Sequence, residues 1–417
     1  MPKLLVCGAK KLEGQIQIHG AKNSTLPLMA ASLICNGQCV LHNCPSLSDV
    51  DTSIRILRHL GCKVERENGT VVIDPTSADH SDIPDHLMRE MRSSIIFLGA
   101  IVSRAGRALL SFPGGCELGP RPIDLHLSAL RKMGVVIDED HGCLNCSAPN
   151  GIRGAVVTLA FPSVGATENI IIAAATAKGN TVVNNAAREP EICDLADFLN
   201  ACGAKIRGAG GSTIFIQGVE KLSGCEHTVI PDRIAAATYL AAAAVTGSTL
   251  TVSSVVPEHL EPIIPVLEES GCRLEIGSES VRISAPERLH RIKSIRTMPY
   301  PGFPTDAQAP VMAMVTTADG TSMFVENIFE SRYKHVGELL RLGANIKVEG
   351  RVAVVDGVDR LSGAPVEATD LRGGAALVVA ALAAQGVTEI TGLHHLDRGY
   401  ENIEKNLAML GADIRRV

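Results

Sequence analysis

One cysteine of the chain is set apart by its surroundings. Cys116 lies in the stretch Pro113-Gly114-Gly115-Cys116-Glu117-Leu118-Gly119-Pro120-Arg121, where prolines exclude helix and glycines permit an irregular loop. Such a loop is accessible, and thiolate chemistry needs both access and a nearby positive charge. Arg121 and Arg92 lie in the same part of the chain. We therefore predict a reactive thiol at Cys116; the alternative is an inert cysteine in a surface turn.

The other cysteines indicate structure rather than reactivity. The chain has 12 cysteines in 417 residues, and several, such as Cys193 and Cys202, lie in apolar contexts, which favours small buried side chains kept reduced. The pair Cys143-x-x-Cys146 has a metal-ligand spacing, but it falls in an expected hairpin, where residues three apart point to opposite faces. No second cysteine pair or histidine cluster completes a zinc set. We expect no metal.

These residues are carried by a sixfold internal repeat with a period of roughly 70 residues. Each copy has an extended segment, an apolar Ala-rich helix, a glycine, a β-branched strand, a more amphipathic helix and two hairpin strands. The apolar helices include residues 169–177, 234–245 and 375–384, and their uniform hydrophobicity predicts burial on all sides. The glycines that end the second helices are Gly61, Gly134, Gly203, Gly271, Gly343 and Gly411.

Only the second copy is lengthened between its two glycine landmarks. The interval from Gly106 to Gly134 is 28 residues, against 23 to 25 in the other copies. The extra residues, about four, surround Cys116. An insertion that breaks a regular repeat indicates a function for the loop that contains it.

The repeat predicts the fold class. A βαβαββ unit that hides one helix completely needs neighbouring units to cover it. We expect an α/β fold with two inside-out α/β domains, each of three βαβαββ repeats with buried central helices and outer sheets. The chain exceeds what one core usually serves, and a boundary near residues 218–230 divides the copies three and three. No proline- or serine-rich linker marks that boundary, so two direct chain crossings are expected.

Composition excludes several classes of function. A net charge of −6 and a pI of about 6.1 give no general electrostatic affinity for nucleic acid or anionic membranes. The first residues contain no apolar signal region, and the longest apolar run, residues 234–245, is too short to cross a bilayer. We expect a cytoplasmic protein that neither binds nucleic acid nor inserts into membranes.

Several motifs together resemble one family of enzymes. The Cys116 loop, continued by Arg121-Pro122-Ile123-Asp124-Leu125-His126 and preceded by Lys22-Asn23, closely resembles the UDP-N-acetylglucosamine 1-carboxyvinyltransferases, the enolpyruvyl transferases that begin peptidoglycan synthesis. The resemblance covers essentially the whole chain. The other matching segments are 161–167, 187–191, Pro304-Thr305-Asp306, Glu330-Ser331-Arg332, Asp370-Leu371-Arg372 and Asp397-Arg398-Gly399-Tyr400.

The resemblance implies a reaction and its participants. The enolpyruvyl group of phosphoenolpyruvate passes to the 3-hydroxyl of UDP-N-acetylglucosamine with release of phosphate, by addition and elimination through a tetrahedral intermediate. This is the first committed step of peptidoglycan synthesis, and so serves cell wall biogenesis, cell shape and cell division. Two small-molecule substrates and no cofactor are implied. The implied domains are residues 22–229 and residues 1–21 plus 230–417, which close on substrate.

The resemblance also assigns roles to residues. Cys116 would be the general acid toward phosphoenolpyruvate and could add to it covalently. Asp306 would take the proton of the sugar 3-hydroxyl, and Asn23 would bond the tetrahedral intermediate. Lys22, Arg121 and Arg398 would bind the phosphate or the carboxylate of phosphoenolpyruvate, because such cations suit those anions. The further substrate-binding positions are Arg92, Pro122, Ile123, Asp124, Leu125, Ser163, Val164, Gly165, Ile328, Arg332, Asp370 and Arg372.

Taken singly, several of these residues have simpler explanations. Asp306 could be a helix N-cap, which is the commoner role for an aspartate there. Asp370 and Arg372 could form a surface ion pair. Gly165 precedes a helix expected to open at about Asn169, where free amides suit phosphate, although a glycine before a helix is commonplace.

Three other functions remain open at this stage. A shikimate-pathway enolpyruvyl transferase would share fold and donor, but we do not expect it to have the Cys116 loop. A non-catalytic repeat scaffold could keep the fold without activity, although the joint presence of Lys22, Cys116, Asp306 and Arg398 argues against it. A zinc protein built on Cys143 and Cys146 is the third.

Overall fold

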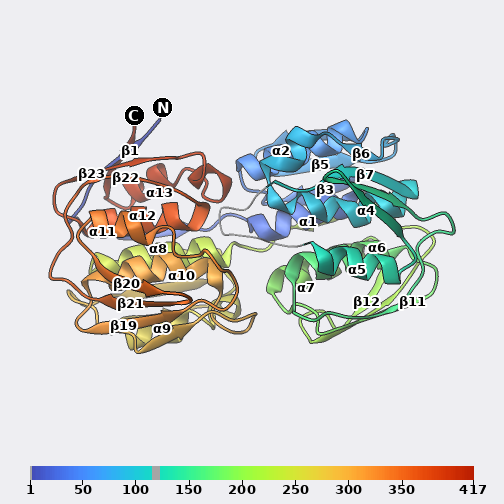
Figure 1. Cartoon of the computed structure of the whole chain (residues 1–417). Coiled ribbons are helices and arrows are strands. Elements are labelled where there is room, and N and C mark those ends of the chain that lie inside the picture. The colour runs from blue at the N-terminus through green and yellow to red at the C-terminus, as the bar shows by residue number, and fades with distance from the viewer. Residues whose placement is uncertain (1, 115–122) are drawn as a thin grey trace. The chain divides into compact units, whose positions relative to one another are not determined.

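A computed structural model describes residues 2–114 and 123–417, and these form two compact units (Figure 1). Unit 2 contains residues 20–114 and 123–230, and unit 1 contains residues 2–19 together with 231–417. The chain therefore passes from one unit to the other between residues 19 and 20, and again between residues 230 and 231. Each unit has its own hydrophobic core.

Unit 2 is built from three repeats, with η marking a 3-10 helix. Its elements are α1 (Lys22–Ser32), β3 (Cys39–His42), α2 (Ser48–His59), β4 (Lys63–Glu67), β5 (Thr70–Asp74), β6 (Asp82–Ile83), α3 (Asp85–Glu90), η1 (Arg92–Ile96), α4 (Phe97–Ala105), β7 (Arg107–Ser111), α5 (Asp124–Lys132), β8 (Val136–Asp140), β9 (Cys143–Ser147), β10 (Val156–Thr158), α6 (Val164–Ala175), β11 (Asn180–Asn184), α7 (Pro190–Ala201), β12 (Lys205–Arg207), β13 (Thr213–Gln217) and β14 (Glu226–Thr228).

Unit 1 repeats the same order of elements three times. They are β1 (Leu4–Cys7), β2 (Glu13–Gln17), α8 (Arg233–Val245), β15 (Thr249–Ser253), η2 (Pro257–Leu260), α9 (Ile264–Glu269), β16 (Arg273–Ile276), β17 (Ser280–Ser284), β18 (Ser294–Arg296), α10 (Thr305–Met314), η3 (Val315–Thr317), β19 (Thr321–Val325), α11 (Val336–Arg341), β20 (Asn345–Glu349), β21 (Val352–Asp356), β22 (Pro365–Glu367), α12 (Leu371–Ala383), β23 (Val387–Thr391), η4 (Leu396–Arg398), α13 (Ile403–Met409) and β24 (Asp413–Arg416).

The described residues form six four-stranded sheets, and all six share one topology. In each, a parallel pair of strands is extended by two antiparallel strands; these two form a hairpin in five of the sheets, and in the sixth they are β1 and β24 from the two ends of the chain. The orders in unit 2 are β14-β3-β5-β4, β6-β7-β9-β8 and β10-β11-β13-β12; those in unit 1 are β2-β15-β17-β16, β18-β19-β21-β20 and β22-β23-β1-β24. The predicted fold of six βαβαββ repeats is confirmed.

Three repeats differ from the prediction, because they take a strand from a distant part of the sequence. The extended segment directly before α1 is β2, and β2 pairs with β15 of unit 1, with Ile16 opposite Val252. The first repeat receives β14 instead, with Glu226 opposite Val40. In the last repeat β1 lies between β23 and β24. Partner choice between strands is non-local, so a repeat pattern alone cannot reveal it.

The apolar helices are central in each unit, as predicted. In unit 1, α8, α10 and α12 pack on one another inside the sheets (Figure 1), and residues 233–244 of α8 are all buried. Alanine side chains are small, so these helix backbones can approach closely. The second helix of each repeat ends at a glycine with positive φ, for example 94° at Gly61 and 90° at Gly343, which is the usual left-handed helix stop.

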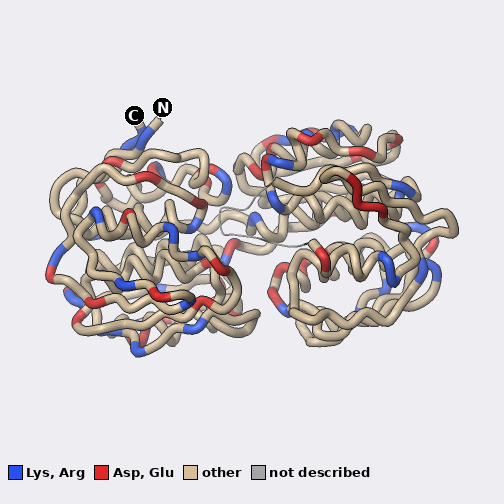
Figure 2. Tube along the Cα trace, viewed as in Figure 1, with Lys and Arg blue, Asp and Glu red and all other residues tan. Residues whose placement is uncertain are grey.

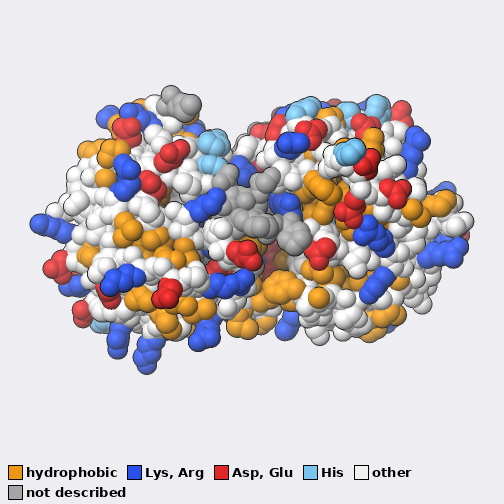
Figure 3. Space-filling view, viewed as in Figure 1, with side chains coloured by type: hydrophobic (Ala, Val, Ile, Leu, Met, Phe, Trp, Pro, Cys, Tyr) orange, Lys and Arg blue, Asp and Glu red, His pale blue; other side chains and the backbone are white. Residues whose placement is uncertain are grey.

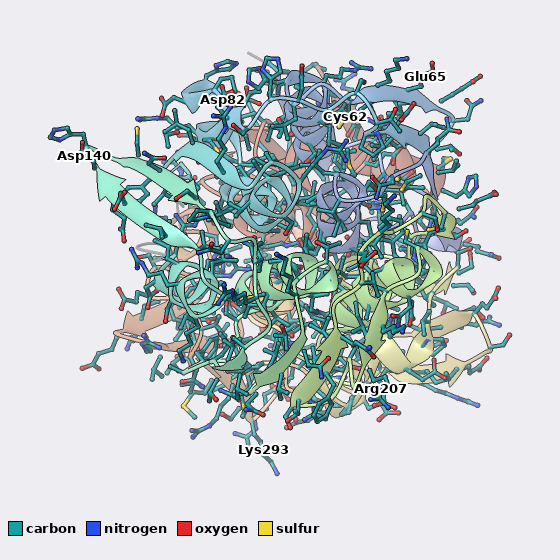
Figure 4. The ribbon with its side chains drawn as sticks, turned by 90° about the vertical axis from the view of Figure 1, so that its right-hand side faces the viewer. Cys62, Glu65, Asp82, Asp140, Arg207 and Lys293 are labelled. Atoms are coloured by element: carbon teal, nitrogen blue, oxygen red, sulfur yellow. The ribbon has the colours of Figure 1, made fainter. Side chains whose placement is uncertain are left out.

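The sheets turn one face to solvent. Glu65, Asp140 and Arg207 lie on the strands of three different sheets in unit 2, and all three side chains are exposed (Figure 4). Residues of both charges are scattered along the described trace of each unit (Figure 2), and the visible surface of neither unit is uniformly basic (Figure 3). No helix in residues 2–114 and 123–417 has the length and hydropathy to span a membrane.

Candidate active site

Asp306 forms the centre of a charged group in unit 1. It is the second residue of α10, and its carboxylate oxygens each accept a hydrogen bond from an arginine. Arg332 Nη2 lies 2.9 Å from Oδ1, and Arg372 Nη2 lies 3.0 Å from Oδ2. The two arginine side chains are 2% and 3% exposed, whereas that of Asp306 is 27% exposed. The carboxylate is therefore held from within by two buried cations and keeps one accessible edge.

The capping alternative for Asp306 is wrong. The N-cap of α10 is Pro304, and no side chain caps that helix. Asp370, in contrast, is the N-cap of α12, and its Oδ1 accepts hydrogen bonds from the backbone N–H groups of Arg372 and Gly373 at 3.0 and 2.9 Å. Asp370 and Arg372 are both buried, so the surface ion pair considered for them is also excluded.

Further contacts fix the guanidinium of Arg372. Its Nη1 donates to the hydroxyl of Tyr400 at 3.2 Å, and that hydroxyl lies 2.9 Å from the hydroxyl of Thr238. Burial by itself lowers the pKa of Arg372, but Asp306 and Tyr400 outweigh it, and the pKa is raised overall. Arg372 is thus a permanently charged group whose position is set before any ligand arrives.

Arg332 is held in a comparable way and lies near a buried neutral histidine. Its Nη2 also donates to the backbone oxygen of Thr305 at 3.0 Å. Burial lowers the pKa of His335 to about 4; Asp370 opposes this shift and Arg332 adds to it. His335 is therefore neutral at pH 7.

Several buried polar atoms of this group have no hydrogen-bond partner in the described part of the chain. They are Nε of Arg332, Nε of Arg372, Oδ2 of Asp370 and both ring nitrogens of His335. Buried polar atoms normally find partners in protein or water. Their concentration around Asp306 indicates a place prepared for a polar ligand or ordered water.

Glu326 positions the loop that follows β19. Its side chain is buried, and its Oε1 accepts hydrogen bonds from the backbone N–H groups of Ile328 and Phe329 at 2.9 and 3.0 Å. Its Oε2 accepts one from the hydroxyl of Thr305 at 3.0 Å. Glu326 thus ties the Ile328 loop to the first turn of α10, next to Asp306. Arg398, half-buried at the end of η4, lies two residues before Tyr400.

In unit 2, Lys22 and Asn23 are the first two residues of α1. Lys22 Nζ lies 2.7 Å from Oδ2 of Asp49, and their side chains are only 10% and 4% exposed. A cation at a helix N-terminus is unfavourable, so Asp49 offsets it here. Lys22 is thus a buried cation that already has a carboxylate beside it, while Asn23 is half-buried.

The N-terminus of α6 carries the next predicted residues. Ser163 is its N-cap, and its hydroxyl accepts from the N–H of Ala166 at 3.4 Å. The helix begins at Val164, about five residues before the predicted start, because this cap ends the extended segment earlier. Val164 and Gly165 therefore lie in the first turn, half-exposed. Their N–H groups have no partner within the helix, and the helix dipole favours an anion there.

Asn169 links this helix to two other segments. Its side chain is fully buried; Oδ1 accepts from the N–H of Gly99 at 2.7 Å, and Nδ2 lies 3.0 Å from the oxygen of Ile95 and 2.8 Å from Nδ1 of His126. Since Oδ1 is the acceptor, Nδ2 donates to Nδ1 of His126. Sequence reasoning missed Asn169, because its contacts with Gly99, Ile95 and His126 arise only on folding.

His126 is consequently a neutral donor. Burial, and to a lesser extent Arg92, lowers its pKa to about 4. With Nδ1 accepting, the ring proton resides on Nε2. The ring packs against Gly165, where a Cβ would lie 3.0 Å from Cε1 and 3.3 Å from Nε2. The N–H of His126 thus adds to the donors at the α6 N-terminus.

The remaining predicted residues divide into two sets. Ile123 is buried, Leu125 is half-buried and Asp124 is exposed at the start of α5. Cys116, Arg121 and Pro122 lie outside the described residues. Unit 2 therefore carries Lys22, Asn23, Arg92, Ile123, Asp124, Leu125, Ser163, Val164 and Gly165, and unit 1 carries Asp306, Ile328, Arg332, Asp370, Arg372 and Arg398.

The cysteine predictions have mixed outcomes. On β9, Cys143 is exposed and Cys146 is buried, so this pair points to opposite faces as predicted, and the zinc alternative built on it fails. Cys202 is buried, whereas Cys193 is only half-buried. The described cysteines are all free thiols.

Comparison with known proteins identifies the family. The family described as EPSP synthase (3-phosphoshikimate 1-carboxyvinyltransferase) matches residues 6–407. The chain belongs to this family of enolpyruvyl transferases. Solved enolpyruvyl transferases share the fold: NikO from Streptomyces tendae superimposes with a TM-score of 0.90 at 26% identity, covering 100% of this chain and 99% of that one. EPSP synthase from Acinetobacter baumannii has a TM-score of 0.75 at 18% identity, with both chains fully covered.

Curated enolpyruvyl transferases match over their full length. The chain is 52% identical over 417 residues, 100% of both chains, to UDP-N-acetylglucosamine 1-carboxyvinyltransferase 2 of Caldanaerobacter subterraneus subsp. tengcongensis. It is 48% identical over 420 residues, 100% of this chain and 95% of the relative, to UDP-N-acetylglucosamine 1-carboxyvinyltransferase 1 of Symbiobacterium thermophilum. The predicted resemblance is confirmed.

Proposed function

We propose that this enolpyruvyl transferase transfers the enolpyruvyl group of phosphoenolpyruvate to the 3-hydroxyl of UDP-N-acetylglucosamine and releases phosphate. The product feeds peptidoglycan synthesis. Full-length relatives at 52% and 48% identity carry the name of that activity. The structural observation that carries the proposal is the carboxylate of Asp306, fixed by Arg332 and Arg372 with one edge accessible.

The Asp306 group suits the acceptor side of this reaction. A carboxylate oxygen has two lone pairs, so each oxygen can accept from an arginine and still meet the sugar hydroxyl. Asp306 takes the hydroxyl proton as the oxygen attacks C2 of the donor. The two buried arginines stabilise negative charge on Asp306 before the transfer and on the donor during it. Asp370 acts indirectly, because it caps α12 and so positions Arg372.

The unit 2 residues suit recognition of the nucleotide sugar. The diphosphate binds the free N–H groups of Val164 and Gly165 and the Nε2–H of His126, with Arg92 nearby. The residues 121–125, together with Ile328 of unit 1, contact the rest of UDP-N-acetylglucosamine. Lys22 binds the phosphate, and Asn23 binds the tetrahedral intermediate. When the phosphate binds, it replaces Asp49 as the partner of Lys22. These contacts use neutral or positive donors throughout, as an anionic ligand requires.

Two sets of roles rest on the resemblance. Cys116 protonates the methylene carbon of phosphoenolpyruvate, and Arg121 and Arg398 bind its anionic groups. The domains that act together are residues 22–229 and residues 1–21 plus 230–417. The free cysteines fit a reducing compartment, and we place the activity in the cytoplasm.

One coupled assay tests the proposal. Phosphate release from phosphoenolpyruvate is measured alone, with UDP-N-acetylglucosamine and with shikimate 3-phosphate. We expect release only with the nucleotide sugar. Release driven by shikimate 3-phosphate would assign the chain to the other branch of the family, and no release with either acceptor would favour the non-catalytic scaffold.

A further inference from the structure

Four cysteines from three separate parts of unit 2 come together in the structure. The Sγ atoms of Cys35, Cys39 and Cys202 all lie within 4.8 Å of one another, and all three residues are buried. The Sγ of Cys225 lies 3.2 Å from that of Cys202. None of the four belongs to the motifs of the proposed active site. We call them the thiol cluster.

The thiol cluster lies where several elements end or begin. Cys35 follows the last turn of α1, and Cys39 is the first residue of β3. Cys202 directly follows α7, and Cys225 directly precedes β14. The cluster therefore joins the first repeat, the third repeat and the strand that the first repeat takes from the far end of the unit.

Backbone contacts hold these segments in place independently of the sulfur atoms. The N–H of Val40 donates to the oxygen of Cys225 at 2.9 Å, and the N–H of Asn36 donates to the oxygen of Leu222 at 2.8 Å. A Cβ at Gly224 would lie only 1.9 Å from the oxygen of Gln38, so glycine alone allows this approach. The positions of the four thiols are thus set by the main chain.

The geometry matches a single tetrahedral metal ion. With Zn–S bonds of about 2.3 Å, the sulfurs of a tetrahedral site are about 3.8 Å apart, which the spacings in the thiol cluster approach. The Cys35-x-x-x-Cys39 spacing falls within the range used by structural zinc sites. A neutral thiol is a weak donor and a weak acceptor, so these three buried thiols and the half-buried Cys225 gain little from one another, whereas thiolates gain greatly from a bound zinc ion.

A half-buried cation, Arg104, lies near the cluster. Nη1 of Arg104 donates to the backbone oxygens of Leu33 and Cys35 at 2.9 and 3.3 Å, and Nη2 donates to that of Pro75 at 2.5 Å. Zinc with four thiolates carries net negative charge, and a guanidinium bonded to the backbone oxygen of Cys35 offsets part of it.

We propose that Cys35, Cys39, Cys202 and Cys225 bind one structural zinc ion in unit 2. The sulfur atoms of the first three lie within 4.8 Å of one another, so side-chain rotations bring them, and Cys225 as the fourth ligand, to the spacing of a tetrahedral site. The ion fixes the C-terminal end of α1, whose N-terminal end carries Lys22 and Asn23. The role is structural, because all four positions are taken by protein sulfur and none is open to substrate.

The test measures metal content and ligand type in the full chain. Protein purified under reducing conditions is loaded with zinc, dialysed against metal-free buffer and analysed by mass spectrometry for metal per chain. Cobalt replaces zinc in a second sample, because thiolate-to-cobalt charge-transfer absorption reports sulfur ligands. The cluster variants are Cys39→Ser and Cys202→Ser. The matched controls are Cys62→Ser, a buried cysteine of the same unit outside the cluster (Figure 4), and Cys143→Ser, an exposed one.

We expect about one zinc ion per chain in the unaltered protein and in both controls, and less than about a tenth of that in the cluster variants. Removal of zinc by a chelator should lower the Tm of the unaltered protein, a readout that does not depend on the variants folding. Three results would overturn the proposal: no zinc and no cobalt–thiolate absorption in the unaltered protein, full zinc content in the cluster variants, or a Cys202–Cys225 disulfide in the native protein.

Discussion

The two units hold their candidate residues by different means. Around Asp306 in unit 1, the hydrogen bonds join charged groups. Two arginines, whose side chains are 2% and 3% exposed, face one carboxylate. Around the N-terminus of α6 in unit 2, the bonds join neutral groups, the amide of Asn169 and the ring of His126. Both arrangements leave donors or lone pairs available beside a partly exposed edge.

This difference indicates a division of work. Charges fixed in a poorly solvated place act strongly on charge that develops during a reaction, so the Asp306 group is suited to lowering the barrier. Backbone N–H groups and a neutral imidazole hold an anion without taking part in proton transfer, so the α6 group is suited to binding. Variants of the Asp306 group should therefore change kcat, and variants of the α6 group should change KM.

The largest effect is expected for Arg372→Met. This change removes one of the arginines that face Asp306 and leaves the Tyr400 hydroxyl with Thr238 but without its arginine donor. We expect kcat to fall by at least ~10² and the free energy of unfolding to fall by about 3 kcal/mol, the low end for breaking a buried pair because Asp306 is partly exposed. Steady-state kinetics and urea unfolding measure both.

The control for Arg372→Met is Lys3→Met, in the same unit. Lys3 pairs with Glu389, and their side chains are 37% and 36% exposed, so its loss should cost less than about 1 kcal/mol and leave kcat unchanged. Unchanged turnover in Arg372→Met would remove unit 1 from the chemical step.

A smaller effect, on KM rather than on kcat, is expected for Gly165→Ala. The new methyl group would approach Cε1 of His126 to 3.0 Å and disturb the first turn of α6. We expect the KM for UDP-N-acetylglucosamine to rise about tenfold, equivalent to one lost hydrogen bond, with kcat nearly unchanged. Gly337→Ala is the control, because a Cβ at Gly337 meets nothing within 4 Å. A fall in kcat alone would contradict the assignment of binding to the α6 group and of catalysis to the Asp306 group.

The third effect concerns stability rather than rate, and should be similar in the two units. Burial lowers the pKa of His126 and of His335 to about 4, from the ordinary 6.5. Because the unfolded chain binds the proton first, stability is complete above pH 6.5 and is lost as pH falls toward 4. Between pH 7 and pH 5 each histidine should lower the free energy of unfolding by about 2 kcal/mol.

The variants His126→Gln and His335→Gln test this pH dependence. Urea unfolding is measured at pH 7 and at pH 5. In each variant, the drop in the free energy of unfolding between these pH values should be smaller by the contribution of the replaced histidine. If neither variant changes the pH dependence, both histidines take up a proton in the folded protein as readily as in the unfolded chain, and burial does not keep them neutral.

The fold could be predicted from sequence wherever the signal was local. The apolar helices, the stops at Gly61 and Gly343 and the hairpins all follow from composition over a few residues, and all are confirmed. The exchange of β2 and β14 between repeats could not be predicted, because nothing in an isolated strand records which neighbour it joins.

The same limit applies to the candidate sites. The family motifs supplied Asp306, Arg332 and Arg372, but their pairing joins residues 26 and 66 positions apart, which no spacing rule anticipates. Glu326 and Asn169 were missed because a single buried polar residue has no motif. The thiol cluster was missed although Cys35 and Cys39 are close in the sequence, because Cys202 and Cys225, which complete it, meet that pair only after folding.

The most direct test of the division of work is Asp306→Asn, studied by two measurements on one preparation. Calorimetry gives the affinity for UDP-N-acetylglucosamine, and rapid mixing gives the rate of a single turnover with phosphoenolpyruvate. We predict nearly unchanged affinity and a rate at least ~10² lower, the scale of lost general-base catalysis. An unchanged rate with weakened affinity would contradict the account, since Asp306 would then be a binding residue and the chemistry would lie elsewhere.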